Sequence, residues 1–160
     1  MIEGSAITWL SLLFLLGCSA FFSSAETALF SLTAAKQKRA GERARKLMEN
    51  PRDILIAVLF SNLVVNLLYF LTAASLGKDD RGAIVAAVGA LLALLIFGEI
   101  LPKTIGLSAP VGIARITAVP LMAVIAATSP IRHVMRRLLE FSGRLLGEHG
   151  VAEPHLRQGD

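Results

Sequence analysis

Four long stretches of apolar residues, separated by short polar segments, dominate the chain. Leucine, alanine, valine and isoleucine fill them over about 20 residues each, the length that a helix needs to cross the hydrocarbon core of a bilayer. The stretches lack the alternation of apolar and polar residues that is typical of a membrane barrel, so we predict helices. They cover residues 7–25, 54–76, 83–101 and 111–131.

The fourth stretch is the weakest candidate for a membrane span. Arg115 lies in its first turns and Pro120 interrupts its middle. A proline inside a helix removes one backbone hydrogen bond and bends the axis, and a bent amphipathic helix is suited to lie along the membrane surface or to dip into it. We therefore expect a juxtamembrane or re-entrant helix over about 111–146, followed by a polar, disordered tail at 147–160.

Two clusters of basic residues set the expected topology. Short loops rich in Lys and Arg stay in the cytoplasm, so both clusters should lie on the same side of the membrane. Three apolar stretches separate the two clusters, and three crossings would place the clusters on opposite sides of the membrane. One of the three stretches should therefore not span it. We predict spans at about 7–30, 54–76 and 82–101, with the N-terminus outside and the C-terminus in the cytoplasm. The first cluster is Lys36, Lys38, Arg39, Arg43, Arg45, Lys46 and Arg52, and the second is Arg132, Arg136, Arg137 and Arg144.

The segment at 33–50, between the first two spans, predicts a short cytoplasmic helical hairpin with Gly41 near its turn. A plain solvated basic loop is the alternative. The expected fold class is thus an all-α polytopic membrane domain at 1–146, with three transmembrane helices, this hairpin and a juxtamembrane helix. No basic residue precedes the first stretch, so a retained helix is expected there instead of a cleaved signal.

Composition narrows the protein class further. Of the 160 residues, 54% are apolar and only 18% are charged, with a net charge of +4. A soluble domain carries about 45–50% apolar and about 25% charged residues. The basic residues are segregated between apolar stretches, unlike those of a nucleic-acid binder. The single cysteine excludes a disulfide framework, and no Cys/His spacing suggests zinc. A soluble enzyme is excluded.

A few polar side chains interrupt the predicted spans. Charged groups inside a membrane are costly and normally face a cavity, a partner or an ion. Asn62 and Asn66 are four residues apart, so their amides share one helix face. Carboxylate, amide and hydroxyl oxygens are the ligands of hard cations such as Mg²⁺, Ca²⁺ or Na⁺. The residues that carry them are Ser23, Ser24, Glu26, Ser61, Asn62, Asn66 and Glu99.

The hexapeptide GEILPK at 98–103 predicts a backbone ligand beside a carboxylate. Pro102 has no N–H, so the carbonyl of Gly98 loses its helical donor. At membrane depth a free carbonyl is tolerated where it lines a cavity or meets an ion, and Gly98 has no side chain to obstruct that approach. We expect the third span to break here, with Pro102 and Lys103 as secondary site residues.

Each of these features also has a purely structural explanation. Ser23 and Glu26 match the capping box at the start of a new helix. The paired asparagines are typical of polar side chains that join neighbouring membrane helices. Glu99 and Lys103 are four residues apart, which favours an ion pair at the interface, and the proline then only ends the helix.

Three motifs together resemble the transmembrane domain of the CNNM/CorC family of magnesium transporters. They are FFSSAETAL at 21–29, SNLVVN at 61–66 and GEILPKT at 98–104, and the resemblance extends from about residue 12 to 140. It implies a homodimeric Mg²⁺ exporter coupled to Na⁺ entry, with three spans and a juxtamembrane helix. Carried over by motif, the implied metal site is Ser23, Ser24, Asn62, Asn66, Gly98 and Glu99. Which of the two serines is the ligand stays open.

The resemblance also implies a cytoplasmic pair of CBS domains, which does not occur before this chain ends at Asp160. Magnesium transport in the inner membrane is therefore the expected function, with Mg²⁺ as the transported ion, Na⁺ as a second ion and membrane lipids as partners. We expect no nucleic-acid partner.

One alternative is a non-transporting, dimeric membrane anchor or sensor for a cytoplasmic regulatory domain. Small residues such as Ala86, Gly89, Ala90 and Ala93 would pack its helices closely. An intramembrane protease would need a Ser/His pair, paired aspartates or a zinc motif, and the three predicted spans contain neither His nor Asp. We therefore expect no enzyme activity.

Overall fold

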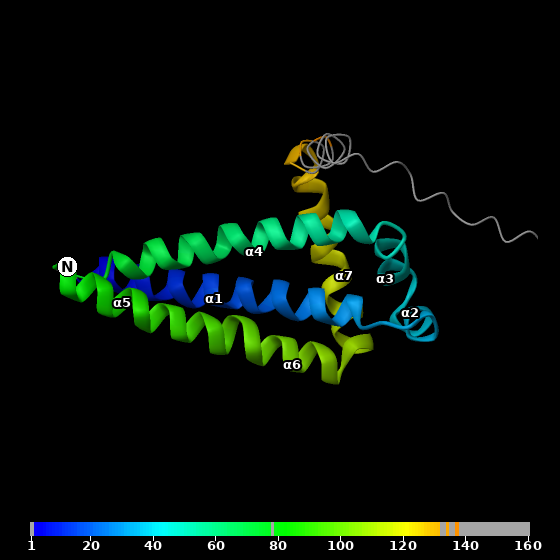
Figure 1. The fold of residues 1–160 in the computed structure, drawn as a ribbon, viewed down its shortest axis with the longest axis horizontal. Helices are drawn as coiled ribbons and strands as arrows, with labels where there is room; N and C mark the ends of the chain where they lie inside the picture. Colours follow the sequence, from blue (N-terminus) through cyan, green and yellow to red (C-terminus); the bar gives the residue numbers. More distant parts are fainter. Residues whose placement is uncertain (1, 78, 132–133, 135–136, 138–160) are drawn as a thin grey trace, which may run out of the picture.

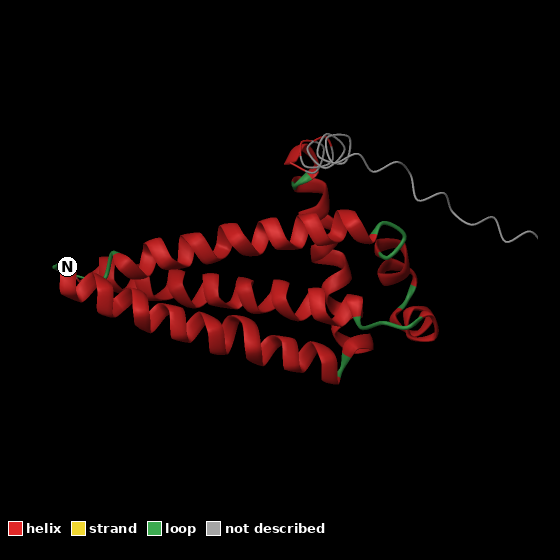
Figure 2. Cartoon of the chain, in the orientation of Figure 1, coloured by secondary structure: helices red, strands yellow, loops and turns green. Residues whose placement is uncertain are grey.

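Helices make up all the regular structure in the computed structural model, which describes residues 2–77, 79–131, 134 and 137. Short loops join these helices (Figure 2). The all-α class is therefore confirmed for the described residues. The elements are α1 (Ile2–Phe30), α2 (Ala34–Ala40), α3 (Glu42–Leu47), α4 (Pro51–Ala74), α5 (Asp80–Ala93), the π-helix η1 (Leu94–Ile100), α6 (Leu101–Ser108) and α7 (Pro110–Ala127).

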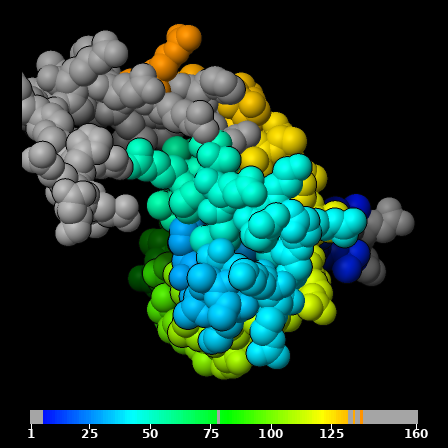
Figure 3. Space-filling model, turned by 90° about the vertical axis from the view of Figure 1, so that its right-hand side faces the viewer, coloured from blue at the N-terminus to red at the C-terminus, as the bar shows by residue number. Residues whose placement is uncertain are grey.

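Three long rods form the body of the molecule (Figure 1). One is α1, the second is α4, and the third is the continuous run of α5, η1 and α6. Helix α1 packs against α4, η1 and α6. The N-terminus and the turn between α4 and α5 lie at one end of the bundle, whereas α2 and α3 lie at the other end. Figure 3 looks onto that second end, which α2 and α3 cover.

Many large apolar side chains point outward from the bundle, and several alanines are completely buried inside it. Phe14 on α1 is 70% exposed and Leu63 on α4 is 65% exposed. By contrast, Ala25, Ala28 and Ala57 are completely buried. Water would oppose such an outer surface, whereas lipid tails accommodate it, and close packing of small residues is typical of membrane helices. The chain is therefore a membrane protein.

Four segments are long and apolar enough to cross a bilayer by length and composition alone. They are Ala6–Phe30, Pro51–Ala74, Asp80–Ser108 and Pro110–Ala127. The first three are the three rods and match the predicted spans, although the third continues seven residues beyond the predicted limit at 101. The fourth is α7, and the count of three spans therefore stays a prediction.

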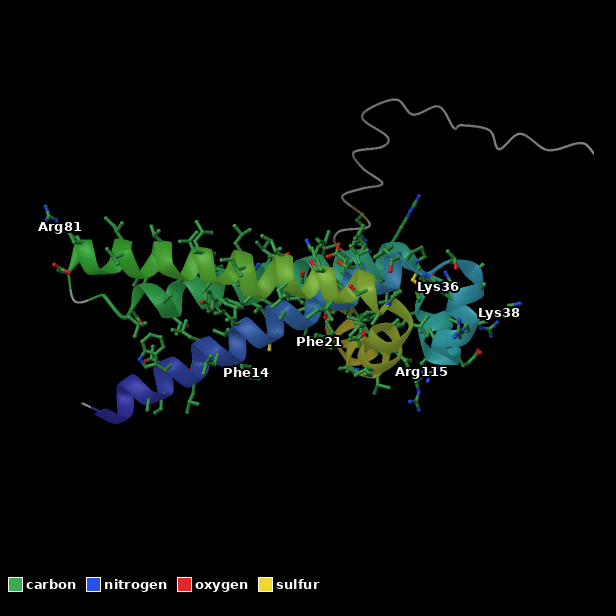
Figure 4. The ribbon with its side chains drawn as sticks, turned by 90° about the horizontal axis from the view of Figure 1, so that it is seen from below. Phe14, Phe21, Lys36, Lys38, Arg81 and Arg115 are labelled. Atoms are coloured by element: carbon green, nitrogen blue, oxygen red, sulfur yellow. The ribbon has the colours of Figure 1, made fainter. Side chains whose placement is uncertain are left out.

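Helix α7 runs across the bundle instead of along it (Figures 1 and 4). Its residues Ala114 and Leu121 are buried in one apolar core with Ala44 and Leu47 of α3. Arg115 donates a hydrogen bond from Nη2 to the carbonyl of Arg39, at 2.6 Å, near the C-terminal end of α2. A cation there also faces the negative end of the helix dipole. Arg115 thus ties α7 to α2.

The predicted juxtamembrane helix at 111–146 corresponds to α7 in its first part only. Pro120 lies inside α7 without ending it, and Pro110 occupies its first turn, where a missing N–H costs nothing. From residue 132 onward, all positions except 134 and 137 lie outside the described residues. The second half of the expected helix, most of the second basic cluster and the tail at 147–160 therefore stay predictions.

Two short helices, α2 and α3, occupy the segment at 33–50 in place of a plain loop. Gly41 separates them with a φ of +102°, a conformation that side-chain-bearing residues rarely adopt. In α3, Glu42 pairs with Arg45 at 2.6 Å, and this ion pair lowers the pKa of the exposed Glu42 carboxyl below its ordinary value. Ala40 of α2 is buried. The segment is thus folded onto the end of the bundle.

Helix α1 corrects one structural explanation offered by the sequence. It continues without interruption from Ile2 to Phe30, so Ser23 lies in mid-helix and cannot be an N-cap. The capping-box interpretation of Ser23 and Glu26 is therefore wrong. The reason is that the apolar residues that follow Glu26 extend the same buried face, with Ala28 and Leu29 fully buried.

The predicted break at Pro102 is also wrong, because the helix widens there and continues. In η1 the N–H of Leu101 bonds to the carbonyl of Ile96, five residues back, as in a π-helix. Pro102 then falls in the first turn of α6, where its missing N–H is tolerated. Five buried residues of this rod follow one another at intervals of four: Ala90, Leu94, Gly98, Pro102 and Gly106.

Candidate ion-binding site

A polar cluster lies in the interior of the bundle, between two apolar cores. One core, near the α4–α5 turn, contains Leu12, Tyr69 and Leu94. The other, toward α2 and α3, contains Phe22 and Val58. The polar side chains come from all three rods: Ser19 and Ser23 on α1, Asn62 on α4, and Glu99 in η1.

The carboxylate of Glu99 is the centre of this cluster. Its Oε1 accepts a hydrogen bond from Nδ2 of Asn62 at 2.9 Å. Its Oε2 accepts one from the hydroxyl of Ser23 at 3.2 Å and is paired with the ammonium of Lys103 at 3.0 Å. The Ser23 hydroxyl also lies 3.4 Å from the backbone carbonyl oxygen of Glu99. All three rods therefore meet at one carboxylate.

Ser19 is a member of the cluster that the sequence interpretation missed. Its side chain is completely buried, and its hydroxyl donates to Oδ1 of Asn62 at 3.2 Å. Ser19 and Ser23 are four residues apart on α1, so they share one helix face. That spacing is the same signal that singled out Asn62 and Asn66, and it was available in the sequence.

Gly98 keeps this part of the cluster closely packed. A Cβ atom at residue 98 would lie 3.0 Å from the hydroxyl oxygen of Ser19 and 3.1 Å from a methyl group of Leu94. Any side chain would therefore press on the serine. The structure thus brings Gly98 next to the cluster, as the sequence predicted, while the free carbonyl at this residue stays a prediction.

Ser23 and Ser24 differ sharply in their surroundings. Ser23 is 1% exposed and contacts Glu99, whereas the hydroxyl of Ser24 donates to the carbonyl of Phe21 in its own helix, at 3.1 Å. Ser24 instead lines an apolar cleft of about 310 Å³ between α1, α6 and α7, which Pro102 also lines. Of the two serines, Ser23 is the one that the structure brings to the carboxylate.

Three other predicted residues do not join the hydrogen-bond network. Glu26 and Ser61 are half-buried, and neither forms a hydrogen bond or ion pair with another described residue. Asn66 lies one turn beyond Asn62 on α4, toward the α4–α5 turn. Its Oδ1 is buried and has no hydrogen-bond partner within the described part of the chain. A buried amide oxygen without a donor is unusual in proteins and is open to a water molecule or a cation.

The donor set of the cluster is suited to a hard cation. It combines one carboxylate with two hydroxyls and an amide, and no group of three or more His, Cys, Asp or Glu side chains occurs in the described residues. Mg²⁺ is typically held by one or two carboxylates and keeps several of its waters. The set lacks the thiolate and imidazole ligands that favour zinc or copper.

Comparison with known proteins assigns the family. Residues 10–160 match the cyclin M (CNNM) transmembrane N-terminal domain. A DUF21 domain-containing chloroplast protein of Arabidopsis thaliana is 29% identical over 155 residues, covering 91% of this chain and 24% of that protein. The UPF0053 inner membrane protein YfjD of Escherichia coli is 28% identical over 139 residues, covering 81% of this chain and 32% of that protein.

The chain thus spans about a quarter to a third of the length of these curated relatives. The match to the family extends over nearly all of the chain and includes all three rods as well as α7. The resemblance seen in the three sequence motifs is therefore confirmed, and this chain belongs to the CNNM transmembrane domain family.

Proposed function

We propose that this domain binds Mg²⁺ inside the bundle and carries it across the membrane, with export coupled to Na⁺ entry. The observation that carries the proposal is the convergence of Ser23, Asn62 and Lys103 on the half-buried Glu99 carboxylate. An intramembrane carboxylate is costly and typically marks a functional site, such as an ion or substrate pathway. The position of the cluster between two apolar cores supports a binding site near the middle of the bilayer.

Binding requires the hydrogen bonds of the cluster to rearrange. Asn62 presents its NH₂ group to Glu99 and its carbonyl oxygen to Ser19. A cation needs oxygens, so the serine hydroxyls turn their protons away and the Asn62 amide turns its Oδ1 toward the ion. These exchanges involve rotation of side chains only. The buried Oδ1 of Asn66, one turn away on α4, supplies a further oxygen along the path.

We propose three spans, with α7 lying in the membrane plane. Because α7 runs across the rods, a bilayer oriented across the three rods leaves α7 along its surface. The basic residues of α2 and α3 then lie in the cytoplasm, with the N-terminus outside. A homodimer in the inner membrane completes the proposal. Ala90, one of the small residues offered for helix pairing, is 7% exposed within the chain itself, whereas Gly89 is exposed.

Calorimetry in detergent and Mg²⁺ flux in liposomes test the site. The substitutions Glu99→Gln and Asn62→Ala should each abolish saturable Mg²⁺ binding and reduce flux to the level of empty liposomes. Glu42→Gln is the matched control, because it removes an exposed carboxylate whose ion pair, among the described residues, is with Arg45 on α3. It should bind and transport as the unmodified chain does.

Two results would contradict the proposal. Saturable Mg²⁺ binding that persists in both Glu99→Gln and Asn62→Ala would show that the binding site is not in the polar cluster. Binding without flux in the unmodified chain would leave the anchor or sensor function as the better explanation.

A further inference from the structure

Lys103 pairs with the carboxylate at the centre of the cluster, yet a role as a metal ligand does not explain its presence there. An ammonium group carries a positive charge and donates hydrogen bonds, so it cannot bind a metal cation. It nevertheless lies 3.0 Å from Oε2 of Glu99, the same oxygen that accepts the hydroxyl of Ser23. The lysine therefore occupies the place beside the carboxylate where a transported cation would make its shortest contact.

We propose that Lys103 competes with Mg²⁺ for Glu99. Its ammonium neutralises the carboxylate until the ion displaces it. The ammonium then returns to the carboxylate and promotes release of the ion. This inference rests on the proposed function of the site. The carboxylate side chain is 23% exposed, and an unpaired carboxylate at that depth in a bundle is costly. The ammonium removes that cost in the absence of a bound ion.

The lysine is suited to leave and return. Its side chain is 48% exposed, so it borders open space on one side and the carboxylate on the other. Ser23, on α1, is almost completely buried, and Asn62, on α4, forms a second hydrogen bond with Ser19, so these two side chains can rotate beside the carboxylate but not leave it. The Lys103 chain has four rotatable carbons and its backbone lies one helical turn from Glu99, so it can swing aside without movement of the helices.

Competition of this kind also suits transport. An ion must bind favourably enough to enter the site and weakly enough to leave it. A fixed cation that re-forms its ion pair as the metal departs lowers the affinity and raises the release rate by the same contact. Removal of the ammonium should then strengthen Mg²⁺ binding and slow turnover. Loss of an ordinary ligand, by contrast, weakens Mg²⁺ binding and also reduces turnover.

The test compares Lys103→Met with Lys38→Met by Mg²⁺ calorimetry in detergent and by flux in liposomes. Lys38 lies on α2, is exposed, and forms no ion pair with another described residue, so its substitution removes the same charge away from the site. For Lys103→Met we expect a Kd about tenfold lower, equal to about 1.4 kcal/mol, together with a lower maximal flux. For Lys38→Met we expect a change below about twofold, since exposed charges are screened.

A second variant keeps the inference testable if Lys103→Met does not fold. Lys103→Arg retains the charge and can clamp the carboxylate with two hydrogen bonds, so it should raise the Kd several-fold. An unchanged or higher Kd in Lys103→Met, or a lower Kd in Lys103→Arg, would overturn the competitor role while binding by the unmodified chain still stands. Absence of saturable binding in the unmodified chain would instead overturn the proposed function, and this inference with it.

Discussion

At the scale of single residues, the candidate site separates into side chains that share one carboxylate and side chains that do not. The sequence identified Ser23, Asn62 and Glu99 because hydroxyl, amide and acid groups are rare in apolar stretches. The sequence did not single out Ser19, because one serine is tolerated in a membrane helix and Ser19 lies outside the three family motifs. Ser24 was identified on the same grounds as Ser23, as a hydroxyl within the span and within the family motif. Adjacent residues on a helix point about 100° apart, so one of the two had to face elsewhere.

Ser19→Ala and Ser24→Ala should therefore behave differently. Loss of the Ser19 hydroxyl leaves Oδ1 of the half-buried Asn62 amide without its donor and removes one oxygen from the site. We expect Mg²⁺ affinity to fall about tenfold, the upper end of what one net hydrogen bond contributes. Ser24→Ala removes only a bond within α1 and should leave affinity within about twofold. Equal effects of the two substitutions in calorimetry would contradict this geometry.

At the scale of helices, the apolar pattern predicted where the rods lie, but not how they continue. A proline and a serine–glutamate pair are the usual signals for helix ends, and both were overridden by packing. Helix α1 passes Ser23 because its next residues are buried, and α6 follows Pro102 because η1 places the proline in a first turn. Local signals do not report such tertiary contacts. The regular interval of four between buried residues in the third rod likewise emerges only from the structure, because Leu94 among them resembles the exposed leucines of the same rod.

Gly106 lies at a close contact between the third rod and α1. A Cβ atom at this residue would lie 2.7 Å from the backbone oxygen of Ser24, and a backbone atom cannot give way as a side chain can. Gly106→Ala should force α6 away from α1 and lower the free energy of unfolding by about 1–3 kcal/mol. It should also weaken Mg²⁺ binding, because Glu99 lies two turns earlier on the same rod.

Gly89→Ala is the matched control for that substitution. Nothing lies within 4 Å of a Cβ at residue 89, and the residue is exposed on α5. Alanine is the better helix former by about 1 kcal/mol, so the variant should be as stable as the unmodified chain or slightly more stable. Thermal unfolding in detergent measures both variants. A Gly106→Ala protein that melts no lower than Gly89→Ala would contradict the close contact between α1 and α6.

At the scale of the whole molecule, the basic residues gather at one end. Lys36, Lys38 and Arg115 lie together at the end of α2, α3 and α7, whereas Arg81 lies at the opposite end (Figure 4). The sequence predicted this separation from charge counts alone. It also predicted, from Arg115 and Pro120, a fourth helix along the membrane surface, whereas the packing of α7 against α3 depends on tertiary contacts that the sequence pattern does not report.

Membrane-impermeant thiol labelling tests the proposed three-span topology in vesicles of one orientation. In a chain with Cys18→Ser, single cysteines would replace Arg45, Asp80, Ala109 and Thr128 one at a time. If α7 lies along the surface, the cysteines at 45, 109 and 128 should react from the same side and the cysteine at 80 from the other. Labelling of the cysteine at 128 from the side of the cysteine at 80 would instead make α7 a fourth span.

The wide turn in the third rod has a consequence for helical phase. Residues four apart advance by about 400° in an α-helix, so each step of the buried stripe would drift by about 40°, and four steps by about 160°. The extra residue of η1 cancels much of that drift and keeps Ala90 and Gly106 on one side. Deleting one residue within η1 should therefore restore an ordinary helix without turning its two halves against each other, because the fifteen remaining steps advance by the same angle. The contact of α6 with α1 would then survive the deletion, and the cost would fall on η1 itself, where Glu99 meets Asn62.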